Sequence, residues 1–221
     1  AWPVALAGVL LALQARFEQF VVKACLPEAE AGGYFAAVRL VELPLFLTGV
    51  IGVSVFPGLA AARAMGETEF AAHAQRLFDL LNGFAWIAAL GLTLLGPWMV
   101  TRLFGHAYDG AIPSLFVLAW GLVPLAGNLA RQQCILAAKP TWLQMAAALA
   151  GLMVQAPLAF SLVARWGAPG AAVASVAANL MSGWLTSFVL PGLRTCGTWQ
   201  ARALLIPFAP HRWRAALTLL S

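Results

Sequence analysis

Charged residues are scarce in this sequence. Asp, Glu, Lys and Arg make up only 10% of the 221 residues, whereas soluble domains carry roughly 25%. Hydrophobic residues make up 62%, and the mean hydropathy is +0.85. This balance excludes an ordinary soluble domain and predicts an integral membrane protein.

Cysteine is also rare and is never paired. Cys25, Cys134 and Cys196 occur singly, with no CxxC motif and no neighbouring histidine. The spacing therefore predicts neither a zinc site nor a disulfide framework, and it indicates packing roles for all three residues. The three histidines fall in expected loop or tail positions, as ordinary surface histidines do.

Motifs for catalysis are missing as well. The sequence has no Walker loop, no HExxH pair, no GxGxxG after a strand and no recognisable Ser/His/Asp arrangement. We therefore expect neither an enzyme nor a cofactor. The net charge of +5 includes no basic cluster interleaved with aromatics, so nucleic acid is not an expected partner.

Long apolar runs, by contrast, fill most of the chain. A helix needs roughly 20 apolar residues to cross about 30 Å of hydrocarbon. The expected transmembrane helices cover residues 2–26, 34–63, 77–102, 111–138, 141–165 and 169–193. The sequence predicts an all-α integral membrane protein, with a six-helix bundle over residues 1–194 and a cytoplasmic or interfacial tail over residues 195–221.

The boundaries of the second and third helices rest on local signals. The segment PEAEAGG predicts a turn, so the second helix is expected to start after Gly33. Pro44 and Pro57 should bend this helix, because each removes a backbone donor and clashes with the preceding turn. The polar segment Arg63–Arg76 is predicted to be a solvated loop.

Basic residues are distributed unevenly among the expected loops, which predicts an orientation. The second and fourth loops and the tail hold eight of them, and the other loops hold two. Excess Lys and Arg mark the cytoplasmic side, so both ends of the chain are expected in the cytoplasm. The first group is Arg63, Arg76, Arg131, Lys139, Arg194, Arg202, Arg212 and Arg214, and the second is Arg102 and Arg165. In the tail, Trp213, Leu217 and Leu220 predict either a helix on the inner leaflet or the start of a further span.

Charged residues inside the apolar runs are the main candidates for function, because a charge in a span is costly unless it faces protein or water. Arg16, Gln19 and Lys23 share one helix face at i, i+3 and i+7. Arg39 and Glu42 are neighbours on the next helix. We expect this hairpin to line a polar cavity.

Three carboxylates are candidates for coupling to protons or sodium ions, or for simple ion pairs. Glu18 lies about 200° round the helix from Arg16 and so faces elsewhere. Glu42 has Arg39 one turn away, which favours an ion pair. Asp79 belongs to a polar stripe with Asn82 on the third helix.

Small and polar residues recur on the last two expected helices. The fifth carries Gln144, Gly151 and Gln155 on one side. In the sixth, a residue that is small or polar recurs every four positions from Ala171 to Gly183, which favours close helix packing.

Several stretches together resemble a known family. They are the Arg-x-Glu-Gln of residues 16–19, GGYFAAVRLVE at 32–42, FPGLA at 56–60, LFGHAY at 103–108 and WGAPGAA at 166–172. In this order they resemble the second half of polysaccharide flippases, the O-antigen (Wzx-type) transporters of the MOP superfamily. That superfamily also holds the MATE multidrug antiporters and the lipid II flippases. Glu18 stands where members often carry Asp.

The resemblance implies a fold, a place and a substrate. It implies one six-helix lobe of a MATE-like transporter in a bacterial inner membrane, with an N-terminal lobe expected before Ala1. The implied substrate is an oligosaccharide on a polyprenyl pyrophosphate, moved by alternating access. The residues expected to bind the pyrophosphate or the glycan are Arg16, Gln19, Lys23, Arg39 and Arg131, since cations suit phosphate.

Two alternatives remain open. A cation-coupled multidrug antiporter of the same fold would favour carboxylates without compensating bases. A non-transporting membrane subunit or fragment would favour a cavity lined by small residues. The sequence identifies neither the glycan nor a coupling ion.

Overall fold

The computed structural model describes residues 2–138, 140, 142–205, 207, 210–217 and 219, and almost all of them are helical. Two elements are 3₁₀ turns (η1 and η3) and one is π-helical (η2). The prediction of an all-α protein is confirmed. In chain order, the elements are α1 (Trp2–Cys25), α2 (Glu28–Met65), α3 (Glu67–Leu103), η1 (His106–Ala111), α4 (Ile112–Ala138), α5 (Trp142–Asn179), η2 (Leu180–Leu185), α6 (Thr186–Val189), η3 (Pro191–Leu193), α7 (Arg194–Leu204) and α8 (Pro210–Leu217).

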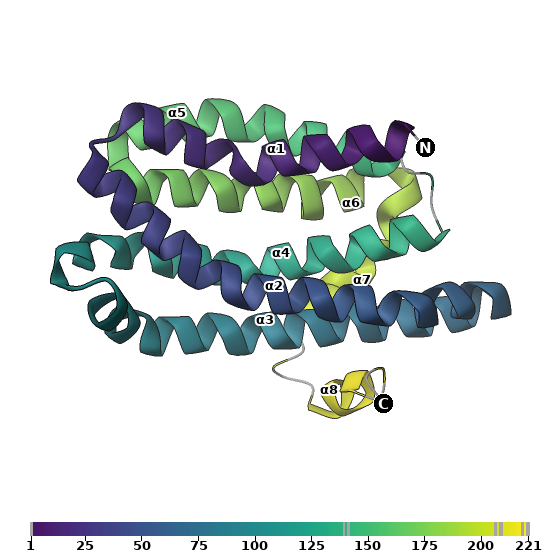
Figure 1. The fold of residues 1–221 in the computed structure, drawn as a ribbon. Helices are drawn as coiled ribbons and strands as arrows, with labels where there is room; N and C mark the ends of the chain where they lie inside the picture. Colours follow the sequence, from purple (N-terminus) through teal and green to yellow (C-terminus); the bar gives the residue numbers. More distant parts are fainter. Residues whose placement is uncertain are drawn as a thin grey trace.

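Gly167 folds the helical element Trp142–Val189 back on itself. Its backbone has φ 60° and ψ −139°, a conformation that glycine adopts readily because it has no Cβ. A Cβ at Gly151 would lie 2.6 Å from the Ser182 Cβ, and one at Gly192 would lie 3.1 Å from Leu143. Residues equally distant from Gly167 therefore face each other, and the two arms of this element are antiparallel (Figure 1).

Three turns meet at one end of the bundle: Leu26–Pro27, η1 and Gly167 (Figure 1). There the backbone amide of Ala168 donates a 2.8 Å hydrogen bond to Glu30 Oε1, and Gly32 lies against Tyr108. The junction between α2 and α3 and the end of α4 lie at the opposite end (Figure 1). The long segments therefore run up and down the bundle in succession.

The expected starts of the second and third helices are wrong. α2 begins at Glu28, because Pro27 sets an extended backbone and Glu28 and Glu30 suit the positive end of the helix dipole. α3 begins at Glu67 rather than at residue 77, directly after Gly66. The expected solvated loop is a helix with a buried stripe that includes Phe70 and Ala74. Its charged residues masked this apolar periodicity.

α2 continues through both of its prolines. Figure 1 shows that it changes direction along its length, as expected from Pro44 and Pro57. The Thr48 hydroxyl donates a 2.8 Å hydrogen bond to the Pro44 carbonyl, a contact that often accompanies helix bending.

Among the described residues, four helical elements are long and apolar enough to cross a membrane: Glu28–Met65, Glu67–Leu103, His106–Ala138 and Trp142–Val189. Large apolar side chains also face outward, with Leu94 78% and Met153 76% exposed, as expected for contact with lipid. The protein is therefore all-α and membrane-embedded. The predicted count of six spanning helices is not confirmed: α1 is not among these four elements, and the last two expected spans form one folded element.

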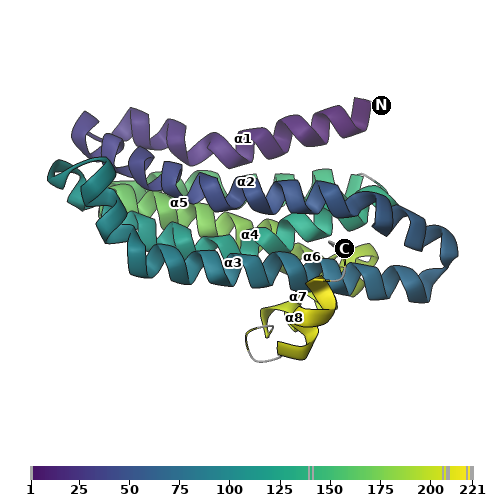
Figure 2. The ribbon, with the colours of Figure 1, turned by 60° about the horizontal axis from the view of Figure 1, so that its bottom comes forward.

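The buried apolar residues form two clusters. The larger joins α2, α3, α4 and the C-terminal helices, and the smaller joins α1, α2 and α5. Figure 2 shows α1 along one side of the bundle and α7 and α8 at another. Between the clusters lie the polar residues described next.

Candidate functional site: a polar cavity between the helices

A cavity of about 450 Å³ lies between α1, α2, α4, α5 and η2. Its wall mixes leucines and valines with a large set of polar side chains. The charged lining residues are Arg16, Glu18, Glu42 and Arg131, and the uncharged polar ones are Gln14, Gln19, Asn128, Gln132, Gln144, Ser175, Asn179 and Ser182.

Arg16 reaches across from α1 to α2. Its Nη1 lies 2.9 Å from Glu42 Oε1 and also donates a 3.2 Å hydrogen bond to Gln19. Arg39 contacts the other oxygen of Glu42 at 3.1 Å. Glu42 thus holds two arginines, whereas the sequence indicated only the local pair with Arg39.

Glu18 points to a different helix. It is 5% exposed, and its Oε2 accepts a 2.6 Å hydrogen bond from Gln155 of α5. Glu18 and Arg16 therefore contact different helices, as their positions on opposite sides of α1 predict. Both side chains nevertheless line the cavity. Gln155 was not predicted as a site residue, but its place on the Gln144–Gly151–Gln155 face was the available signal.

Arg131 is the most deeply buried charge at the cavity, at 2% exposed. Its Nη1 donates to the Ser182 carbonyl at 2.7 Å and to the Thr186 hydroxyl at 2.9 Å. The Gly183 carbonyl and the Ser187 hydroxyl lie at 3.2 and 3.4 Å. All four partners are uncharged oxygens on or beside the π-helical turn η2. Arg131 therefore fastens that turn to α4.

The structure brings only part of the predicted set together. Arg16, Gln19 and Arg131, with the carboxylates Glu18 and Glu42, line the cavity. Lys23 is exposed near the end of α1, and the Arg39 side chain is 76% exposed; neither belongs to the lining. Their binding roles stay predictions.

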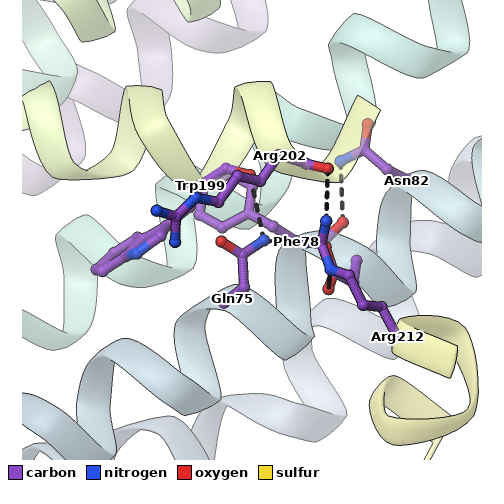
Figure 3. A network of polar contacts seen from close by, with 7 residues as sticks. Gln75, Phe78, Asn82, Trp199, Arg202 and Arg212 are labelled. Carbon is purple, nitrogen blue, oxygen red and sulfur yellow. Dashed lines mark hydrogen bonds and ion pairs between the residues drawn. The ribbon is translucent and has the colours of Figure 1, made fainter. Parts of the chain in front are cut away.

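Figure 3 shows a second polar network, which includes Gln75, Trp199, Arg202 and Arg212. Asp79 belongs to this network and is not among the residues that line the cavity. Both of its carboxylate oxygens pair with Arg212 of α8, at 2.5 and 3.1 Å. Gln75 donates to Asp79 at 2.9 Å and to the Trp199 carbonyl at 3.3 Å, and Arg212 donates to the Arg202 carbonyl at 2.9 Å. The network therefore ties α3 to both C-terminal helices.

The described part of the tail packs against the bundle, and its placement at the membrane surface or at the start of a further span stays a prediction. α7 and α8 pack on α3, and a Cβ at Gly83 would lie 1.9 Å from the Trp213 ring. Only glycine allows this approach. Leu220, part of the predicted apolar face, lies outside the described residues.

These contacts also bear on the orientation that was predicted from basic residues in the loops. Arg131 is buried in the bundle and Arg212 is paired with Asp79, so neither marks a free loop. Lys139 lies outside the described residues. The charge asymmetry that predicts the orientation is correspondingly smaller.

The cavity wall carries both charged and amide side chains. In the part of the chain that the structure describes, no three His, Cys, Asp or Glu side chains gather to hold a metal ion. Comparisons with family models, curated protein sequences and solved structures find no match for the chain. A functional assignment therefore depends on the chemistry of the cavity itself.

Proposed function

We propose that this protein moves an amphipathic substrate, an oligosaccharide on a polyprenyl pyrophosphate, across a bacterial inner membrane. The observation that carries the proposal is the polar cavity inside a bundle of membrane-length helices. Such a lining is costly in a membrane and is retained where a polar group must pass. The helices form one wall of the pathway, and a second six-helix lobe forms the other, with alternating access between them.

Arg16 is the residue on which transport depends. It is 55% exposed and faces the cavity, and its contact with Glu42 crosses from α1 to α2. A substrate phosphate that competes with Glu42 would release α1 from α2. This exchange connects substrate binding to a movement of the wall.

The test compares Arg16→Ala with Arg39→Ala in the full-length protein. Both arginines contact Glu42, but only Arg16 lines the cavity. Complementation of surface polysaccharide and flipping of lipid-linked oligosaccharide in proteoliposomes should both be lost with Arg16→Ala and retained with Arg39→Ala. Membrane abundance should stay equal. Normal export by Arg16→Ala at normal abundance contradicts the proposal.

The buried carboxylate favours a second candidate, a cation-coupled multidrug antiporter. Glu18 is held by Gln155 at the cavity wall and has no arginine within salt-bridge distance among the described residues. Under this alternative, Glu18→Gln abolishes proton- or sodium-driven drug efflux, and Arg16→Ala has little effect. A non-transporting subunit would retain its function in both variants.

We further propose that the chain crosses the membrane six times, with both of its ends in the cytoplasm. The turns at Pro27, η1 and Gly167 share one end of the bundle, and this end faces the periplasm. In a Cys25→Ser background, a cysteine at Asp109 should react with an impermeant maleimide in intact cells, and one at Thr68 should not. The reverse pattern contradicts this orientation.

A further inference from the structure

The charges of the cavity cancel one another. Arg16 and Arg131 face Glu18 and Glu42 around the same space. Arg16 is already held by Glu42 and Gln19, and Nη1 of Arg131 is held by oxygens of η2 and α6. The pyrophosphate can therefore gain a cation only by displacing Glu42 from Arg16, and the rest of the cavity offers it no net positive charge.

Side-chain amides supply most of the remaining polar surface. Gln14 and Gln144 are 6% and 7% exposed, and each has a buried amide oxygen without a hydrogen-bond partner. The same holds for Asn128 Oδ1, and Nε of Arg131 is a buried donor without a partner. Buried groups of this kind are costly to leave unpaired. A ligand that forms hydrogen bonds with them would therefore remove that cost.

The kind of ligand follows from what these groups need. Amide oxygens accept hydrogen bonds, whereas amide nitrogens and Arg131 Nε donate them. A phosphate only accepts and would be repelled by the amide oxygens. A hydroxyl group both donates and accepts, so it satisfies either end of each amide, whichever way the amide is turned.

We infer that the cavity binds the uncharged, hydroxyl-rich glycan of the substrate, with Gln14, Asn128, Gln132 and Gln144 as its hydrogen-bonding groups, and that the pyrophosphate stays outside these groups. The inference rests on the proposed function and sharpens it. Amide side chains that rotate into the cavity take the sugar hydroxyls as partners. The leucines and valines between them contact the apolar faces of the sugar rings.

The experiment measures binding of two separate probes, maltotriose and inorganic pyrophosphate, to the full-length protein in nanodiscs. Saturation-transfer NMR reports contact with maltotriose, and the phosphorus line width reports contact with pyrophosphate. The key variant is Gln144→Leu, which keeps the size of the side chain and removes the amide. Gln132→Leu and Gln133→Leu form a matched pair of neighbours on α4, of which only Gln132 lines the cavity.

Wild type and Gln133→Leu should transfer saturation to maltotriose, and Gln144→Leu and Gln132→Leu should lose at least tenfold in affinity. Gel filtration identifies variants that fail to fold. If Gln144→Leu fails to fold, the comparison of Gln132→Leu with Gln133→Leu decides the outcome. Pyrophosphate should bind weakly and equally to all variants. Equal maltotriose binding by both members of the pair, or displacement of maltotriose by pyrophosphate, overturns the inference.

A flipping assay with lipid-linked oligosaccharide separates this inference from the proposed function. If wild type flips the lipid and Gln144→Leu flips it equally fast, the inference fails and the function stands. If wild type binds maltotriose through Gln144 but flips no lipid-linked oligosaccharide, the proposed function fails. In that second case, the cavity still binds hydroxyl-rich ligands, but the ligand is not a lipid-linked oligosaccharide.

Discussion

Arg131 and Arg212 hold the C-terminal segments to the bundle in opposite ways. Arg131 is 2% exposed, and its hydrogen-bond partners among the described residues are carbonyl and hydroxyl oxygens. Arg212 is 24% exposed at its side chain and pairs with both oxygens of Asp79. One site uses neutral dipoles at η2 and α6, and the other uses an ion pair between α3 and α8.

The comparison teaches that a charge inside an apolar run need not contact a substrate. Arg131 and Asp79 were both predicted to act on substrate or ion, yet each has a set of structural partners. Arg16 differs from both, because its partner Glu42 is 28% exposed and the pair borders open space. The exposed fraction of the side chain, rather than its charge, separates Arg16 from Arg131 and Asp79.

The largest expected effect is on the Arg131 site. Arg131→Met should destabilise the protein by about 2–4 kcal/mol, because buried oxygens lose their donor and the π-helical turn loses its anchor. Arg131→Lys should recover part of the loss, since it keeps a charge and a donor. The measurement is the apparent melting temperature in detergent, followed by gel filtration. An unchanged melting temperature for Arg131→Met would mean that η2 holds itself in place.

A smaller effect is expected at Asp79. Asp79→Ala should destabilise by about 1–2 kcal/mol, because the pair is only partly buried and Arg212 can turn toward water. The double variant with Arg212→Ala should cost little more than either single change, which a double-mutant cycle measures. Faster trypsin cleavage after Arg212 should accompany the loss. Fully additive effects would show that the two side chains act independently.

The smallest effect is expected from Gly83→Ala, which tests the packing beside the ion pair. The added methyl group would meet the Trp213 ring, so we expect a loss of roughly 1 kcal/mol, in line with overpacking at a yielding site. Gly91→Ala is the matched control on the same helix, because apart from the nearby backbone of that helix no atom of the described residues lies within 4 Å of the added Cβ. It should be neutral or slightly stabilising. Equal melting temperatures for the two variants would argue against a close contact with α8.

Much of the secondary structure could be predicted from the sequence, but the helix ends could not. The expected helices at 2–26 and 111–138 coincide closely with α1 and α4. The start of α2 was misplaced because Gly32 and Gly33 suggested a turn, although both lie inside the helix against η1. Glycine weakens a helix only modestly, and tertiary contacts override that preference.

The candidate site was predicted in part, for a similar reason. The face shared by Arg16 and Gln19 follows from helical periodicity and is present as a hydrogen bond. The contacts from Arg16 to Glu42 and from Glu18 to Gln155 join residues on different helices, and periodicity within one helix cannot reveal them.

The sequence by itself determined that the protein is a helical membrane protein, because scarce charge and long apolar runs leave no other stable arrangement in water or lipid. It also determined which side chains share a helix face. Only the tertiary structure decided the partner of each buried polar group. Many pairings suit the same composition, and the helix packing places a few of them within hydrogen-bonding distance. That choice gave Arg131 and Asp79 partners within the fold, and it left Arg16 exposed at the cavity beside the amides.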